Sequence, residues 1–93
     1  MIRPATHDDL PAMAALEASE PMGSQWRIEQ LEEELNRDHA QVLVAASQDG
    51  FLGHAIAWLV ADELEIMSIA IHPQHRRQGI GQALLSHLLN LPH

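Results

Sequence analysis

The chain lacks cysteine, lysine and tyrosine, and it has only two tryptophans and one phenylalanine among 93 residues. The absence of cysteine excludes disulfides, cysteine-ligated metal centres and thiol catalysis. The absence of lysine excludes a Walker-type phosphate loop and a Schiff-base lysine. So few aromatic rings argue against the stacking platforms that bind single-stranded nucleic acid.

Positive charge is also scarce. Five arginines stand against 13 acidic residues, which gives a formal net charge of −8. Because a surface this acidic repels a phosphate backbone, we expect no nucleic acid partner. No apolar run approaches the roughly 18–20 residues that span a bilayer, and no secretory signal follows Met1. We therefore expect a cytoplasmic protein with no membrane partner.

What the chain does have is the composition of one globular domain, with 46% hydrophobic and 19% charged residues. We treat residues 1–93 as a single domain, because the length allows one modest core. Hydrophobic periodicity predicts strands at 2–5, 42–46, 51–61 and 64–71, a first helix ending near 17, and helices at about 26–36 and 79–91. This β-α-α-β-β-β-α order predicts an α+β fold, with helices on a mostly antiparallel sheet.

Turn residues separate these elements. A break is expected at 20–24, a tight hairpin at Asp49-Gly50, a turn at Asp62-Glu63, and the end of the last strand before Pro73. In the helix at 26–36, an apolar stripe of Ile28, Leu31 and Leu35 is expected to face the core. The outer, solvated face is expected to carry the four glutamates of this helix, Glu29, Glu32, Glu33 and Glu34.

The most informative segment is 69–84, where an apolar strand enters a loop with two adjacent arginines and then a glycine-rich helix start. The first turn of a helix offers unpaired N–H groups, and glycines let a backbone approach a phosphate closely. Two of the five basic residues lie together here, which indicates an anionic ligand. A dinucleotide fingerprint is excluded, because Leu84 stands where its third glycine would fall. The alternative is a tight turn with solvated arginines.

The run Arg76-Arg77-Gln78-Gly79-Ile80-Gly81 matches the (Arg/Gln)-x-x-Gly-x-(Gly/Ala) signature of the GNAT N-acetyltransferases, and the chain resembles that family. The preceding run 66–73 looks like the family's fourth strand, and the opening run 2–10 like its first strand and helix. Within the family, the sequence is most similar to the bacterial ribosomal-protein alanine N-acetyltransferases. The resemblance covers essentially the whole chain and implies a GNAT acyl-CoA N-acyltransferase-like fold.

The resemblance also implies acetyl-CoA as cosubstrate, without a metal. Main-chain groups of Ile69, Ala70 and Ile71 would pair with the pantetheine arm, as a further strand would. The pyrophosphate would be wrapped by the turn, whose implied binding residues are Arg76, Arg77, Gln78, Gly79, Ile80, Gly81 and Gln82. A primary amine, such as a protein N-terminus, would attack the thioester directly, so the protein must orient it and remove a proton.

Two residues are candidates for the general base. Glu65 lies where the histone-acetyltransferase branch of the family carries its base, and its alternative is a solvent-facing position on a strand. His72 is the second candidate, and its alternative is a loop-edge histidine before proline. His72 and His75 also have an i, i+3 spacing that occurs in metal sites, but no third ligand lies near them in the sequence.

A complete GNAT domain continues after its third helix, so the resemblance implies that these residues are the N-terminal portion of the domain, truncated there. The strand at 64–71 would then have an open edge. We expect the chain to form a homo-oligomer or to require a completing chain. Two alternatives stay open: a catalytically inactive half-domain that binds CoA or a protein partner, and a nucleotide-binding regulator that uses the same glycine turn.

Overall fold

The computed structural model describes residues 1–20 and 26–90. In this part of the chain, four antiparallel strands form one sheet in the order β1-β2-β3-β4. The elements are β1 (Ile2–Pro4), η1 (His7–Asp9), α1 (Leu10–Ser19), α2 (Ile28–Leu35), β2 (Ala40–Ser47), β3 (Gly50–Val60), β4 (Glu63–Ile71), η2 (Pro73–His75) and α3 (Ile80–Leu89). The predicted β-α-α-β-β-β-α order and the α+β class are confirmed, and the 3₁₀ turns η1 and η2 are additions.

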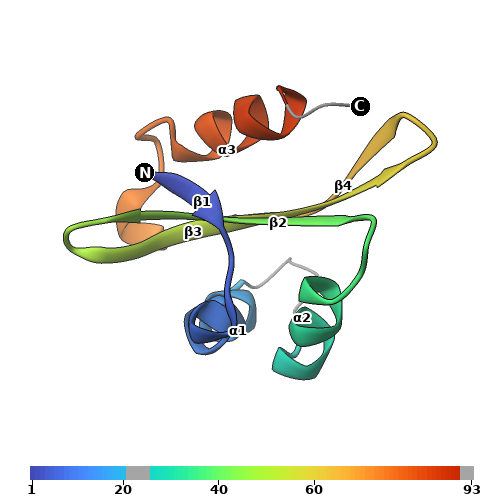
Figure 1. Ribbon diagram of the computed structural model, residues 1–93. Coiled ribbons are helices and arrows are strands. Elements are labelled where there is room, and N and C mark those ends of the chain that lie inside the picture. The colour runs from blue at the N-terminus through green and yellow to red at the C-terminus, as the bar shows by residue number, and fades with distance from the viewer. Residues whose placement is uncertain (21–25, 91–93) are drawn as a thin grey trace.

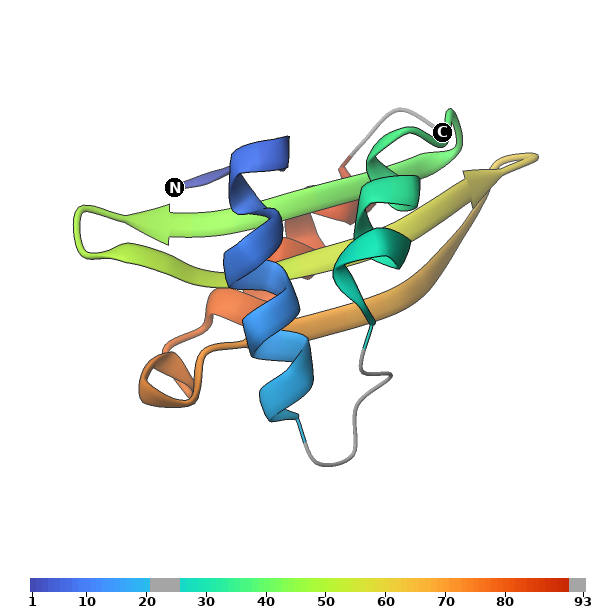
Figure 2. The same ribbon diagram turned by 90° about the horizontal axis from the view of Figure 1, so that it is seen from below.

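The helices cover both faces of the sheet. Figure 1 shows the sheet edge-on, with α3 on one face and α1 and α2 on the other. Figure 2 shows α1 and α2 side by side across the strands of their face. The sheet is therefore a central layer, and each face has a core of its own.

The two hairpins depend on residues with positive φ. At the β2–β3 turn, Gly50 has φ 114°, as the Asp49-Gly50 pair predicts. At the β3–β4 turn, Ala61 and Asp62 have φ 51° and 67°, so this turn lies one residue earlier than predicted and Glu63 already belongs to β4. Of the predicted break at 20–24, residues 21–24 lie outside the described residues, and so does residue 91 at the predicted end of the last helix.

A bulge interrupts the β3–β4 pairing. Ile56 lies opposite Ser68, whereas Ala57 lies opposite Ile66, so Met67 is an extra residue in β4. Met67 packs against the core under α1 and α2, and the next residue, Ser68, is hydrogen-bonded to α1. A bulge places two successive side chains on one face, and here it brings Ser68 to the face of the sheet that α1 covers.

The α2 helix departs from the predicted polarity at two positions. Glu34 is buried, with only 2% of its surface exposed. Its Oε1 accepts a hydrogen bond from Trp58 Nε1 at 2.5 Å, and its Oε2 accepts one from Arg37 Nε at 2.5 Å. Ile28, expected in the core, is 40% exposed. The prediction that Glu34 faces solvent is wrong because two donors from outside the helix satisfy its carboxylate.

Candidate functional site

Strand β4 lies at the edge of the sheet and pairs only with β3 in the described part of the chain. The N–H of His72 donates to the carbonyl of Leu52 at 2.8 Å. Because main-chain groups alternate in direction along an antiparallel strand, Ile69 and Ile71 direct their N–H and C=O groups to the open edge. The segment Ile69–Ile71 thus offers hydrogen-bonding groups to an extended ligand.

The turn after β4 combines left-handed backbone with a helix start. Arg77 has φ 64° and Gly79 has φ 81°. Gly79 is the residue that precedes α3, and no side chain caps that end of the helix. The first N–H groups of a helix have no acceptor within it and carry a partial positive charge. The turn therefore offers N–H donors that the helix itself leaves unpaired.

Gly81 places the start of α3 directly over β4. A Cβ added at Gly81 would lie 3.8 Å from Ile71 Cγ1 and 3.9 Å from Ile69 Cγ2, which is ordinary van der Waals contact. Gly53 on β3 is tighter, because its Cβ would lie 2.6 Å from the carbonyl oxygen of Ala70. Gly53 thus allows a close approach of the β3 and β4 backbones, and the start of α3 packs against side chains of β4.

The two arginines of the turn have different surroundings. Arg76 Nη2 donates to Glu20 Oε1 at 2.5 Å, and Arg76 Nε donates to the carbonyl oxygen of Ile71 at 3.2 Å. The guanidinium of Arg77 makes no ion pair or hydrogen bond with the residues that the structure describes. Arg77 is therefore the arginine with its charge available to an anion at this turn.

The two candidate bases lie at opposite ends of β4. Glu65 is exposed near the start of the strand, opposite Trp58 on β3. His72 follows the end of the strand, and its Nδ1 accepts the N–H of Gln74 at 3.3 Å. At about 3.3 Å per residue, the seven residue steps from Glu65 to His72 span roughly 23 Å. The structure does not bring Glu65 and His72 together, so they are alternatives and not partners.

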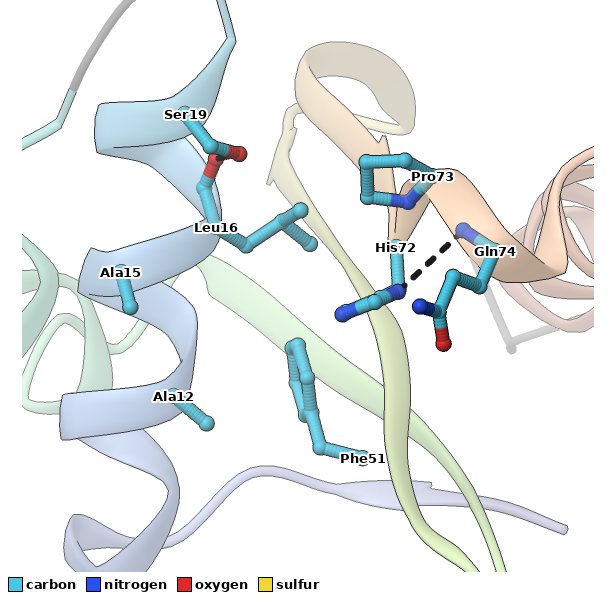
Figure 3. Close-up of a pocket in the computed structure, with 8 residues that line it drawn as sticks. All are labelled: Ala12, Ala15, Leu16, Ser19, Phe51, His72, Pro73 and Gln74. Carbon is cyan, nitrogen blue, oxygen red and sulfur yellow. Dashed lines mark hydrogen bonds between the residues drawn. The ribbon is translucent and has the colours of Figure 1, made fainter.

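A pocket of about 480 Å³ lies between α1 and the end of β4. Its lining is mostly apolar and consists of Ala12, Ala15, Leu16, Ser19, Phe51, His72, Pro73 and Gln74. Figure 3 shows the His72 ring directed from the end of the strand toward α1. The pocket is on the face of the sheet opposite α3, so it is separate from the glycine turn.

A buried polar cluster joins α1 to β3 and β4. Glu17 Oε2 accepts hydrogen bonds from His54 Nε2 at 3.1 Å and Ser68 Oγ at 3.3 Å, and Glu17 Oε1 accepts one from the main-chain N–H of Trp26 at 3.4 Å. Burial opposes ionisation of Glu17, but the hydrogen bond and the charge of His54 outweigh it, so the pKa of Glu17 is lowered. The sequence contains no signal for this cluster, because Glu17 and His54 are 37 residues apart.

Two further findings concern residues 1–20 and 26–90. No three side chains of the metal-ligating types gather in one place there. His72 and His75 have ring centroids 5.7 Å apart, and no third ligand lies with them. None of the helices described in these ranges has the length and apolarity to cross a bilayer.

Comparison with known proteins identifies the family of this chain. The Acetyltransferase (GNAT) family matches residues 9–91. A Bacillus subtilis (strain 168) protein, provisionally named as a ribosomal protein bS18-alanine N-acetyltransferase, is 29% identical over 85 residues, which are 90% of this chain and 56% of that protein.

Two solved structures have the same fold. The ribosomal-protein-S18-alanine N-acetyltransferase of Escherichia coli superposes with a TM-score of 0.84 at 27% identity, over 97% of this chain and 57% of that one. The PaiA N-acetyltransferase of Thermoplasma acidophilum, solved in complex with coenzyme A, gives a TM-score of 0.80 at 16% identity, over 96% of this chain and 69% of that one. The chain thus spans little more than half the length of the Bacillus and Escherichia relatives. It belongs to the GNAT acetyltransferase family.

Proposed function

We propose that this chain binds acetyl-CoA along the open edge of β4 and at the turn before α3, and that it serves transfer of the acetyl group to a primary amine. The observation that carries the proposal is the arrangement of these two features. The outward main-chain groups of Ile69 and Ile71 run directly into a turn with Gly79 in the left-handed region and an uncapped helix start. The amides of a pantetheine arm fit the first feature, and a diphosphate fits the second.

The proposed reaction needs no covalent enzyme intermediate. The amine nitrogen attacks the thioester carbonyl, a C–N bond forms, the C–S bond breaks, and CoA leaves as its thiolate. The amine proton goes to a general base, for which we propose Glu65, because it is exposed on the strand that would hold the cofactor. His72 is the second candidate. It lies close to the turn that would hold the diphosphate, and so farther from the thioester end of an arm that runs back along β4.

The acceptor class rests on the relatives. Two of them are named for acetylation of an alanine of a ribosomal protein. On this basis we propose a protein N-terminal amine as the acceptor of this chain. A ribosomal acceptor would place the reaction in the cytoplasm. The part of the open β4 edge that precedes Ile69, where Ile66 is 40% exposed, favours pairing with a second copy or a completing chain, which sedimentation of the purified chain tests.

Calorimetric titration with CoA and acetyl-CoA tests binding. Mapping of the amide chemical-shift changes by NMR locates the residues that bind the ligand. We expect the largest shifts at 69–71 and 77–82. Shifts elsewhere, or no binding of either compound, would overturn the proposal. ATP and NAD serve as controls, because a general nucleotide site would bind them as well as CoA.

A thiol-release assay with amine acceptors tests turnover. Glu65→Gln should lower turnover by about 10²-fold or more, as expected for loss of a general base, and leave the CoA affinity unchanged. His72→Gln is the matched variant and should retain turnover. Equal turnover of Glu65→Gln and wild type across the pH range would exclude Glu65 as the base. Binding of CoA without turnover would identify a CoA-binding half-domain instead of an enzyme.

A further inference from the structure

We propose that Glu20 holds Arg76 across the cofactor edge of the free protein, and that Arg76 must exchange this carboxylate for the cofactor when CoA binds. The inference rests on the proposed function and adds a regulatory contact to it. Glu20 is the residue that follows α1, and Arg76 lies in the turn after β4, 56 residues away. The contact therefore joins the end of α1 to the phosphate turn.

The Arg76 guanidinium occupies a main-chain acceptor of β4. Its Nε donates to the carbonyl oxygen of Ile71 at 3.2 Å. That carbonyl is one of the main-chain groups that β4 directs to its open edge, where the arm of the cofactor would pair. In the free protein, Arg76 thus takes an acceptor that the proposed ligand needs.

The charges at this ion pair also favour the exchange. Glu20 Oε1 lies 2.5 Å from Arg76 Nη2, so the carboxylate neutralises one of the two arginines at the turn. The diphosphate of CoA carries more negative charge than one carboxylate, and phosphates form strong, charge-assisted hydrogen bonds with the arginine fork. With the side chain of Arg76 48% exposed and that of Glu20 21% exposed, the pair is accessible to solvent, and partner exchange requires no core rearrangement.

The contact also links two parts of the molecule. Four of the eight residues around the 480 Å³ pocket come from α1, and three come from the stretch just before Arg76 (Figure 3). The Glu20–Arg76 pair connects the same two walls. Exchange of partners at Arg76 would therefore couple occupancy of the phosphate turn to the attachment of α1 beside the pocket.

Glu20→Gln tests the exchange with little change in shape. The amide oxygen of Gln still accepts from Arg76, but the competing charge is gone. We expect CoA to bind about two- to fivefold more tightly at low ionic strength, the range for one exposed ion pair, and the gain to shrink at high ionic strength. The matched control is Glu63→Gln, which removes the same charge at the far end of β4 and should leave the affinity unchanged.

Arg76→Gln completes a double-mutant cycle. In that background, Glu20→Gln should have no effect on CoA affinity, because the pair is already broken. Calorimetry measures the CoA affinity of the four proteins. In the wild type, NMR also follows the Arg76 Nε–H resonance, which should shift on addition of CoA because the Nε–H group leaves the Ile71 carbonyl.

The outcomes separate the two proposals. If wild type binds CoA and Glu20→Gln binds no more tightly than Glu63→Gln, or gains equally in the Arg76→Gln background, the exchange is wrong and the proposed function stands. If none of the proteins binds CoA, the proposed function fails and the exchange fails with it.

Discussion

The face of the sheet that packs against α3 and the face that packs against α1 and α2 bury different groups. Under α3 the core is apolar, formed by Leu43, Ala45, Ala55, Ala57, Leu84 and Leu88. Under α1 and α2 the core also holds two carboxylates, Glu17 and Glu34, each 2% exposed. Apolar contacts have no fixed direction, whereas each buried carboxylate needs its donors in place. Apolar packing thus fixes α3 over its face of the sheet, whereas hydrogen bonds fix α1 and α2 to particular strand residues.

The largest effect is expected when one of the two buried carboxylates, that of Glu17, is removed from the face under α1 and α2. Glu17→Leu leaves His54 Nε2, Ser68 Oγ and the Trp26 N–H without their acceptor. Breaking a buried pair in this way should lower the free energy of unfolding by about 3–5 kcal/mol. Urea denaturation followed by circular dichroism measures the loss.

A double variant is the control for that experiment. Glu17→Leu with His54→Phe replaces both partners by apolar groups, and such replacement of a whole buried pair is often close to neutral. We expect the double variant to be more stable than Glu17→Leu alone. If the double variant loses as much free energy of unfolding as Glu17→Leu and His54→Phe lose together, or more, that result would show that Glu17 and His54 are not a coupled pair.

On the apolar face, Leu84→Ala should cost about 2–5 kcal/mol, because Leu84 is fully buried and its truncation leaves a cavity. The loss should be the same at every pH where the protein is folded, because none of the residues in this core titrates. Thermal unfolding at several pH values measures it. A loss that varies with pH would mean that the two faces are coupled more closely than their separate cores indicate.

The two faces also differ in how far the sequence predicts them. The apolar periodicity of the helix that carries Leu84 and Leu88 predicts its buried side, and Gly79 and Gly81 at its start predict the turn. The polar face could not be predicted, because Glu17 and Glu34 have acidic side chains whose donors lie far away in the sequence. His54 is 37 residues from Glu17, and Trp58 is 24 residues from Glu34. Only tertiary structure brings such partners together, and the same holds for the pair formed by Glu20 and Arg76.

Two glycines on the α3 side of the sheet differ in the space that a side chain would have. Gly53→Ala should cost about 1–3 kcal/mol, because the new Cβ would lie 2.6 Å from a main-chain oxygen and the strands must shift. Gly81→Ala meets only ordinary contacts and should stabilise the protein by up to about 1 kcal/mol, because alanine favours a helix. Denaturation of the two variants gives the comparison. Equal losses would mean that close approach at β3–β4 is not what Gly53 provides.

The smallest effect concerns an ion pair before α1. Asp9 accepts from Arg3 Nη1 at 2.7 Å and Nη2 at 2.8 Å, and also from the N–H of Thr6 at 2.8 Å. The hydrogen bonds from Arg3 lower the pKa of Asp9 from 3.8 to about 2, against the effect of burial. Because the folded protein favours the ionised form, this contribution is fully present above about pH 4 and is lost as the pH falls through about 2.

Asp9→Asn should therefore lower stability at neutral pH by at most about 1 kcal/mol, since Arg3 is partly exposed and water screens the pair. It should also flatten the part of the stability curve between about pH 4 and 2 that Asp9 provides. Urea titrations at successive pH values measure both effects, and Leu84→Ala, which alters only the apolar core, should keep the wild-type slope. If Asp9→Asn kept that slope as well, the acid sensitivity would belong to another carboxylate, and the buried Glu17, whose pKa is also lowered, would be the next group to test.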